Sequence, residues 1–375
     1  MKIDVLLLDQ LAKRQSHGGV VRYIRHMIAA LNERFSDRFA VCSDLLHLPA
    51  DTYRVHLPDL RFRGMYHLGL DGVVSCAQGY LLNRLLKRIK PRLVFSPFFG
   101  LIAEGTPQVF TVYDFALELY PHYFAKRFLP MQLAQMRECY RHASALFCIS
   151  ESTRNDLLRL YPFVNPERVH VTHLGVDESF FSGSKDTANE TPYFLFVGDR
   201  GRTKNFARSL EAFALSGLAR NYMFRVVTPR PAHVGKWTQI ESDFIRTHNL
   251  ESRIKLETSV PDDRLRMLYR NADFFIYPSE YEGFGLPILE AMASGTIVLC
   301  SSTSSLPEVA GDAAVYFDPY DVWSIGNALQ RAATLSSDDR NTMIEKGFAR
   351  ARLFTWSSCA DKTISVLKNL LVSQQ

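Results

Sequence analysis

Short apolar runs alternate with longer amphipathic stretches along the whole chain. In Val20–Phe35, apolar residues recur at helical spacing, which predicts a helix with one buried face. Leu81–Ile89 predicts a second helix, with basic residues on its outer side. Apolar runs predict strands at Lys2–Asp9, Leu93–Pro97, Val109–Tyr113, Ala145–Ile149 and Val169–Leu174. Continuous apolar runs of this kind are typical of a parallel sheet that helices cover on both faces.

The alternation of apolar and amphipathic stretches stops at Ser182–Thr191, where the residues are small and polar and show no periodicity. We interpret this segment as a linker between domains. Beyond it, apolar runs predict strands at Tyr193–Val197, Phe224–Val227, Arg253–Leu256, Phe274–Tyr277, Ile297–Cys300 and Ala314–Phe317. Repeated strand–helix units on both sides of the linker predict an α/β fold of two doubly wound domains, at residues 1–181 and 192–355.

Composition narrows the class of protein. The chain of 375 residues is 47% hydrophobic and 22% charged, as is usual for globular proteins. No run approaches the roughly 20 apolar residues that a transmembrane helix needs, and Met1–Asp9 is typical of a strand rather than a signal peptide. We therefore expect a cytoplasmic protein. Its six cysteines form no C-x-x-C pair, so we expect reduced thiols and no zinc site.

Charge is divided unevenly between the two halves. Residues 1–180 hold 22 Lys and Arg against 17 Asp and Glu, a net of +5, whereas residues 181–375 hold 22 of each. No basic stripe with interleaved aromatic residues accompanies the excess, so we do not expect a nucleic acid as partner. An anionic membrane surface or a phosphate-linked acceptor is a suitable partner for this positive charge. The alternative is that the excess arose by chance.

The segment 277–295 carries the most informative chemistry. Glu282 and Glu290 stand eight positions apart, with glycines between them and an apolar run before them. This pattern predicts a strand, a glycine loop and a helix, with Pro287 in the first turn and Gly295 just past the end. Backbone N–H groups at such a helix start form an anion site, and carboxylates accept paired hydroxyls. The segment therefore predicts a site for a nucleotide-sugar.

Two other strand ends carry candidate phosphate ligands. Gly18 and Gly19 follow the first strand, where a glycine pair lets the backbone approach a phosphate or simply forms a tight turn. Arg22 is either an anion contact or a solvated helix residue. The loop after Val197 adds three cations, Arg200, Arg202 and Lys204. Fixed cations stabilise the negative charge that builds on a departing diphosphate.

The segment around Glu282 and Glu290 resembles the E-x7-E motif of family 4 glycosyltransferases. Further blocks match this family in the same order, at Ser150–Thr153, Leu174–Asp177, Val197–Gly198, Lys204–Asn205, Asn271–Asp273, Ser305–Ala314, Phe317–Pro319 and Phe354–Trp356. The resemblance spans nearly the whole chain and is most specific after residue 190. It implies the GT-B fold, in which an acceptor-binding and a donor-binding Rossmann-like domain face each other across a cleft. It also implies that the last helix, residues 356–375, packs back onto the first domain.

For the sugar and nucleoside of the donor, the resemblance assigns roles by position. Glu290 would hold the ribose hydroxyls, and Glu282 would bind hydroxyls of the transferred sugar. Phe284, Gly285 and Leu286 would offer backbone N–H groups to sugar and phosphate.

For the diphosphate, the resemblance implies the lysine at Lys204 and an arginine that is either Arg200 or Arg202. The glycine loop at Gly19 would lie against the same group. GT-B enzymes generally need no metal ion, because protein cations stabilise the leaving group. We therefore expect no metal and no cofactor besides the donor substrate.

Tyr113 departs from the family, which commonly has histidine there. The tyrosine hydroxyl can form a hydrogen bond but cannot act as a base near neutral pH. The family's mechanism also uses the backbone carbonyl at this position, which any substitution leaves in place. Asp114 would hold its loop, cap nearby amides or contact the acceptor.

The chain also resembles bacterial mannosyltransferases of O-antigen or similar surface-polysaccharide assembly. This resemblance implies a retaining transfer of mannose from GDP-mannose to a lipid-linked or oligosaccharide acceptor at the inner membrane face. A related GDP-deoxysugar is the next candidate donor. Further alternatives are a UDP-sugar donor, a nucleotide-sugar epimerase or hydrolase, and a non-catalytic nucleotide-sugar-binding scaffold.

Overall fold

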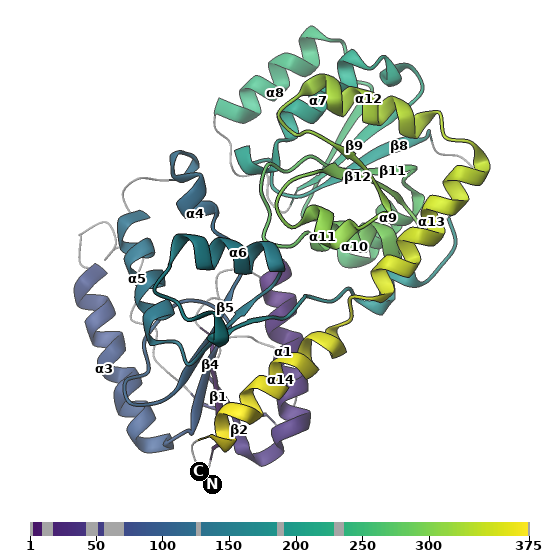
Figure 1. Cartoon of the computed structure of the whole chain (residues 1–375). Coiled ribbons are helices and arrows are strands. Elements are labelled where there is room, and N and C mark those ends of the chain that lie inside the picture. The colour runs from purple at the N-terminus through teal and green to yellow at the C-terminus, as the bar shows by residue number, and fades with distance from the viewer. Residues whose placement is uncertain are drawn as a thin grey trace. The chain divides into compact units, whose positions relative to one another are not determined.

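The computed structural model describes residues 3–9, 18–42, 52–55, 71–124, 129–185, 191–228 and 236–373. The chain divides into two compact units (Figure 1). Unit 1 comprises Met1–His173 and Trp356–Gln375, and unit 2 comprises Leu174–Thr355. Among the described residues, no helix is long and apolar enough to cross a membrane.

Unit 1 is built on a parallel sheet of seven strands in the order β3-β2-β1-β4-β5-β6-β7. The strands are β1 (Val5–Leu8), β2 (Phe39–Cys42), β3 (Tyr53–Arg54), β4 (Leu93–Ser96), β5 (Gln108–Val112), β6 (Ala145–Cys148) and β7 (Val169–Val171). The helices are α1 (Gly19–Phe35), α3 (Asp71–Ile89), α4 (Ala116–Leu119), α5 (Leu129–His142), α6 (Glu151–Leu160) and α14 (Trp356–Val372). Short 3-10 turns lie at Ser36–Arg38, Pro121–Tyr123 and Pro166–Arg168.

Helix α14 packs against α1 within unit 1 (Figure 1). The Trp356 ring stacks on the His26 ring, with centroids 4.4 Å apart and planes 9° from parallel. Farther along the same pair of helices, Arg34 donates a hydrogen bond to Asp361 at 3.1 Å. The last helix therefore contributes side chains to a unit whose other residues end at His173.

Unit 2 is built on a parallel sheet of six strands in the order β10-β9-β8-β11-β12-β13. The strands are β8 (Tyr193–Val197), β9 (Met223–Thr228), β10 (Ile254–Thr258), β11 (Phe274–Tyr277), β12 (Ile297–Ser301) and β13 (Ala314–Phe317). The helices are α7 (Phe206–Leu215), α8 (Lys236–Thr247), α9 (Asp262–Asn271), α10 (Leu286–Ala293), α11 (Leu306–Ala310), α12 (Val322–Ala333) and α13 (Ser337–Arg352). Short 3-10 turns lie at Glu178–Phe181, Arg202–Lys204 and Leu218–Arg220.

The core of unit 2 is rich in phenylalanine. Phe194 stacks on Phe274 of the neighbouring strand, with ring centroids 4.9 Å apart, and meets Phe213 of α7 edge-on. Helices α7 and α12 cover one face of the sheet, and α10, α11 and α13 cover the other (Figure 1). On the second face, Gly295 has a φ of 76°, and a Cβ there would lie 3.1 Å from Phe348 Cζ. Glycine thus ends α10 where α13 comes closest.

The division between units does not fall where the sequence placed its linker. The predicted domains end at 181 and begin at 192, whereas the compact units change between His173 and Leu174. The Arg270 guanidinium donates to the Ser182 carbonyl, and Lys185 Nζ lies 3.2 Å from Asp273 Oδ1. Phe180 is buried and meets the Tyr269 ring. Residues 174–185 therefore belong to unit 2 because they pack on its helix α9; residues 186–190 lie outside the described part of the chain.

Some observed elements differ from the predicted ones in their bounds, and two were not predicted. Helix α3 begins at Asp71, ten positions before the predicted start at Leu81. Strand β5 ends at Val112, so Tyr113 lies in the loop that follows rather than in the strand. Strands β2 and β3 were not predicted, and each is short. Ser150 is the cap of α6, since its hydroxyl accepts from the Thr153 amide at 2.9 Å.

Each sheet has one point where the strand order reverses. In unit 1, β1 lies between β2 and β4, and in unit 2, β8 lies between β9 and β11. In open α/β sheets, ligands bind outside the carboxyl ends of the strands at such a switch point. The loops after β8 and β11, and those after β1 and β4, are therefore the places to look for a site.

Candidate functional site

At the switch point of unit 2, the loop after β11 leads into helix α10. Gly285 caps this helix with a φ of 116°, and a Cβ there would lie 3.0 Å from Leu306 Cδ2. Both the backbone angle and the close approach therefore require glycine. Ser305 holds the loop, since its hydroxyl bridges the carbonyls of Glu282 at 2.9 Å and Phe284 at 2.7 Å. The resemblance had drawn on the block containing Ser305 but assigned it no role.

The amides of Gly285 and Leu286 form no hydrogen bond to another residue in the described part of the chain. They stand at the start of α10, where the helix dipole favours negative charge. Pro287 occupies the first turn, where its missing N–H breaks no bond. The glycine cap and the proline stand where the sequence predicted them, and binding of an anionic group at this helix start stays a prediction.

Glu282 and Lys204 meet at the carboxyl ends of β8 and β11, although they lie 78 positions apart in sequence. Lys204 Nζ donates to Glu282 Oε1 at 2.6 Å, and the Ser279 hydroxyl donates to the same oxygen at 2.7 Å. The side chains are 26% and 11% exposed, so the pair is only partly accessible to solvent. Burial first, and then the Glu282 carboxylate, hold the pKa of Tyr277 well above its usual range. The phenol thus stays neutral beside the ion pair.

Glu290 lies on α10, one helix turn after Leu286, and is 2% exposed. A carboxylate so deeply buried is stable only when it is hydrogen-bonded. Binding of the ribose hydroxyls, the role that the resemblance implied for Glu290, stays a prediction.

Arg200 and Arg202 both lie in the loop after β8. Arg200 forms an ion pair with Glu241 of α8, a residue that is 3% exposed. Burial raises the pKa of Glu241 to about 7, and the Arg200 guanidinium opposes that rise. The backbone of Arg202 lies in the 3-10 turn Arg202–Lys204, while its side chain is outside the described part. The structure thus gives Arg200 a fixed partner and leaves the choice between the two arginines open.

Asn205 and Arg208, which sequence reasoning did not single out as site residues, tie three loops together. Asn205 has left-handed backbone angles, and its Nδ2 donates to the carbonyls of Pro278 at 3.0 Å and Pro319 at 2.8 Å. Arg208 donates to Asn205 Oδ1 at 2.7 Å and to Glu280 Oε1 at 3.1 Å. This network fixes the loop that carries Lys204. The one signal in the sequence was the pairing of Asn205 with Lys204 in the family block.

At the switch point of unit 1, Gly18 precedes α1 with a φ of 133°, and Gly19 begins the helix. The Arg22 amide donates to the Gly18 carbonyl at 3.1 Å, so the glycine pair forms the helix's first turn. Residues 10–17, the rest of the predicted glycine loop, lie outside the described part of the chain.

Tyr113 lies after β5 and is held from both ends. Its hydroxyl donates to the Pro97 carbonyl at 2.7 Å, and its own carbonyl accepts from Thr153 Oγ1 at 3.1 Å. Burial holds the pKa of Tyr113 well above its usual range, so the phenol remains protonated. A carbonyl oxygen has two lone pairs, so this one can accept a second hydrogen bond.

Asp114 accepts a hydrogen bond from the Ala116 amide at 3.0 Å, at the start of α4. This is the amide-capping role that the sequence left open. No group of three or more His, Cys, Asp or Glu in the described part of the chain could hold a metal ion. Independence from metal stays a prediction.

Comparisons with known proteins agree with this arrangement. The family model "Glycosyl transferases group 1" matches residues 177–350, and the model "Glycosyltransferase Family 4" matches residues 17–180. The O-antigen chain mannosyltransferase B of Escherichia coli is 29% identical over 295 residues, which cover 76% of this chain and 76% of that protein. The MMP alpha-(1->4)-mannosyltransferase of Mycolicibacterium hassiacum is 28% identical over 235 residues, which cover 62% of this chain and only 55% of that protein.

Among solved structures, the sucrose-phosphate synthase of Thermosynechococcus elongatus has a TM-score of 0.76 at 17% identity, covering 99% of this chain and 100% of that one. At this identity the likeness concerns the fold. Together with the two family models and the two parallel sheets, it confirms the predicted GT-B fold.

Proposed function

We propose that this chain, which belongs to the family 4 glycosyltransferases with the GT-B fold, transfers mannose from GDP-mannose to a hydroxyl of a lipid-linked or oligosaccharide acceptor. The observation that carries the proposal is the meeting of Lys204 and Glu282, at 2.6 Å, beside the free amides of α10. Cation, carboxylate and helix start are the three groups that a nucleotide-diphospho-sugar requires. The choice of mannose draws on the names of the two mannosyltransferase relatives.

In this proposal the donor diphosphate lies against Lys204 and the amides of Gly285 and Leu286. As the bond to the sugar breaks, negative charge builds on the departing phosphate, and these groups stabilise it because they are already in place. Arg200 adds a second cation, which Glu241 holds by its ion pair. Lys204 must then turn part of its hydrogen bonding from Glu282 to phosphate. The protein's own cations do the work for which other enzymes use a metal ion, so we expect transfer without one.

Glu282 would bind hydroxyls of the transferred sugar, and Glu290 the ribose hydroxyls. Tyr113 would act through its carbonyl, next to the anomeric carbon, since its phenol stays protonated. None of these residues stands out as an enzymatic nucleophile. Attack by the acceptor hydroxyl on the same face that the phosphate leaves would therefore give retention of configuration, with the phosphate oxygen accepting the acceptor's proton.

The acceptor would be a glycan intermediate of bacterial surface-polysaccharide synthesis, carried on a lipid at the inner face of the membrane. The excess of positive charge in residues 1–180 supports peripheral contact of unit 1 with anionic lipid headgroups. Binding to vesicles that contain anionic lipid, compared with neutral vesicles, tests this part separately.

A thermal-shift panel of GDP, UDP, ADP, CDP and TDP tests the donor. We expect stabilisation by GDP, since binding to the folded state alone raises the unfolding temperature. A shift with UDP alone would replace GDP-mannose by a UDP-sugar. No shift with any nucleotide would contradict a preformed donor site.

Transfer of labelled mannose from GDP-mannose then tests the reaction. We expect release of GDP to depend on added acceptor, which separates a transferase from an epimerase or hydrolase of the same fold. A wild type that binds donor but turns it over no faster than the Glu282→Ala variant would be a scaffold.

A further inference from the structure

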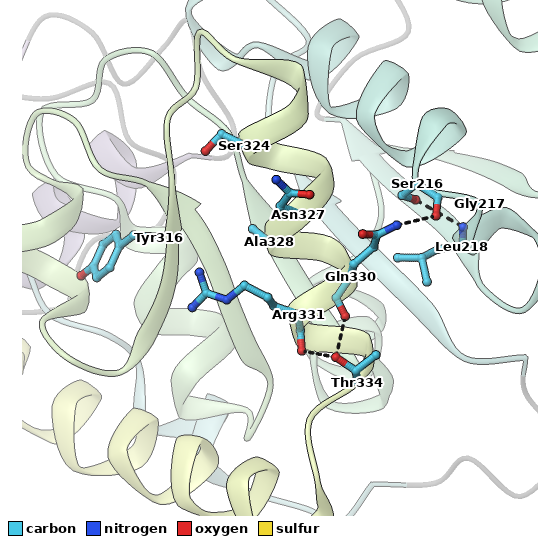
Figure 2. A pocket seen from close by; sticks show the side chains of 10 residues that line it. All are labelled: Ser216, Gly217, Leu218, Tyr316, Ser324, Asn327, Ala328, Gln330, Arg331 and Thr334. Atoms are coloured by element: carbon cyan, nitrogen blue, oxygen red, sulfur yellow. Dashed lines mark hydrogen bonds between the residues drawn. The ribbon is translucent and has the colours of Figure 1, made fainter.

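A hollow lies on unit 2 beside helix α12, and none of the predicted donor residues lines it (Figure 2). Its volume is about 860 Å³. The groups around it are mostly neutral hydrogen-bonding ones, including Ser324, Asn327 and Gln330, together with Arg331 and Tyr316. Leu218 and Ala328 supply the aliphatic part of the lining.

Two of the lining side chains are free to bind. Asn327 and Arg331 have no hydrogen-bond or ion-pair partner for their side chains in the described part of the chain, and they stand four positions apart on α12. Residues at this spacing face the same way, and Figure 2 shows both along one helix. Gln330, by contrast, is occupied, because its Nε2 donates to the Ser216 carbonyl at 3.1 Å. The hollow therefore offers an amide and a guanidinium with unused donors.

Two exposed aromatic residues extend this row toward the start of α12. Trp323 is 63% exposed and lies one turn before Asn327, and Tyr320 is 53% exposed in the loop before the helix. Two local hydrogen bonds hold this loop: Asp321 accepts from the Trp323 amide and Asp318 from the Tyr320 amide, each at 2.9 Å. We call Tyr320, Trp323, Asn327 and Arg331 the α12 row.

The loop at the start of the α12 row is fastened to the candidate donor site. The Pro319 carbonyl accepts from Asn205 at 2.8 Å and from Arg208 at 2.9 Å, and Asn205 directly follows Lys204. The Arg208 guanidinium carbon lies 6.0 Å from the centre of the Tyr320 ring. The α12 row thus begins next to the loop that carries Lys204 and runs away from it along the helix.

These groups match the surface of a sugar chain. The C–H face of a pyranose packs on an aromatic ring, while its hydroxyls accept hydrogen bonds from amide and guanidinium groups and donate them to carboxylates such as Asp318 and Asp321. Among the described residues of α12, Trp323 is the one exposed large hydrophobic side chain. A protein partner would need a broader apolar centre.

We propose that the α12 row is a second glycan-binding site, which holds sugar units of the acceptor chain remote from the hydroxyl that reacts. The inference rests on the proposed glycosyltransferase function and deepens it. By retaining a long acceptor, this site would favour chains that are already extended over short ones.

A binding experiment without donor tests the site directly. Trp323 is one of three tryptophans in the chain, so we expect a saturable fluorescence change when a long mannan-derived oligosaccharide is titrated into the full-length protein. In Asn327→Ala, which keeps the reporting indole, the affinity should weaken roughly tenfold, as for a central contact of an interface. For Trp323→Ala, which removes the indole, calorimetric titration should show the same loss of affinity. Tyr80→Ala is the matched control, because Tyr80 is 67% exposed on helix α3 of unit 1. No saturable change in the wild type would overturn the proposal.

Transfer kinetics separate the failure of this inference from that of the proposed function. With a long acceptor, Trp323→Ala should raise the acceptor KM roughly tenfold while leaving kcat and the donor KM unchanged. With a mannose disaccharide, variant and wild type should behave alike. If Trp323→Ala and the wild type had the same acceptor KM for the long and for the short acceptor, the α12 row would not be a glycan-binding site, while the transferase function would stand. A wild type that transfers to neither acceptor would fail as the proposed enzyme, and the fluorescence titration would then decide on the site alone.

Discussion

The two switch points share a topology but differ in chemistry. In unit 2, the loops after β8 and β11 bring together Lys204, Glu282 and Arg200 with its buried partner. In unit 1, the strand ends near the switch point bring together hydroxyl and aromatic groups beside a buried acid, Asp9, which directly follows β1 and adds to the effect of burial in raising the pKa of Tyr113. There the Tyr23 hydroxyl lies 3.0 Å from Thr111 Oγ1, and the Tyr113 ring meets the Tyr23 ring edge-on.

This difference indicates a division of labour. A charged group at the end of a parallel sheet stabilises charge that forms during a reaction, whereas neutral aromatic and hydroxyl groups orient uncharged partners. The same fold can therefore handle a leaving diphosphate in one unit and position an acceptor in the other. Each prediction below tests one side of that contrast, from the largest expected effect to the smallest.

Lys204→Ala should have the largest effect. Loss of the cation beside the diphosphate should lower kcat roughly 100-fold, since a single preorganised group of this kind contributes about that much. Steady-state transfer kinetics measure it. Lys185→Ala is the matched control, because Lys185 also pairs with an acid of unit 2, at 3.2 Å from Asp273. Equal loss in both variants would mean that the effect is structural.

Glu290→Gln should mainly weaken donor binding. A hydrogen bond to a charged group is worth about 1.5–3 kcal/mol, so we expect the nucleotide Kd to rise about tenfold or more. Calorimetric titration with GDP measures this, and Glu211→Gln, at an exposed position on α7, serves as control. An unchanged Kd would show that Glu290 does not bind the ribose. It would also weaken the assignment of donor binding to the charged groups of unit 2.

The Arg200–Glu241 pair predicts a pH dependence of stability. The folded-state pKa of Glu241 is raised from 4.5 to about 7, mainly by burial. The folded state then binds a proton that the unfolded state has lost, so this group's contribution to stability is complete below about pH 4.5 and disappears as pH rises through about 7. Unfolding temperatures of the wild type should fall over that window relative to those of Glu241→Gln. Parallel curves would show that Glu241 titrates normally.

Tyr113→Phe should have the smallest effect on transfer. It removes the hydrogen bond to the Pro97 carbonyl, which costs about 1 kcal/mol of unfolding free energy. Because the proposed role belongs to the backbone carbonyl, kcat should change less than about threefold, and Tyr113→His should stay active too. Denaturant unfolding and transfer assays measure the two quantities. A large fall in kcat without loss of stability would give the phenol a chemical role, and unit 1 would no longer be purely a positioning unit.

Features that depend on local backbone geometry were predictable from the sequence. The glycine loop and helix start around Gly285 and Pro287 follow from backbone requirements that no distant residue alters. Asp114 shows the limit of such reasoning. A short acid after a strand can cap amides or face a ligand, and only the position of the Ala116 amide shows that it caps.

The sequence by itself determined the two parallel α/β sheets and the segment that carries Glu282 and Glu290, because periodicity and backbone constraints act over a few residues. Tertiary structure decided which charges meet. Lys204 reaches Glu282 across 78 positions, and Arg200 reaches Glu241 across 41. Both contacts depend on strand order: β8 lies beside β11 although β9 and β10 come between them in sequence. That order is set by crossover connections and by the burial of whole sheet faces, which no local pattern records.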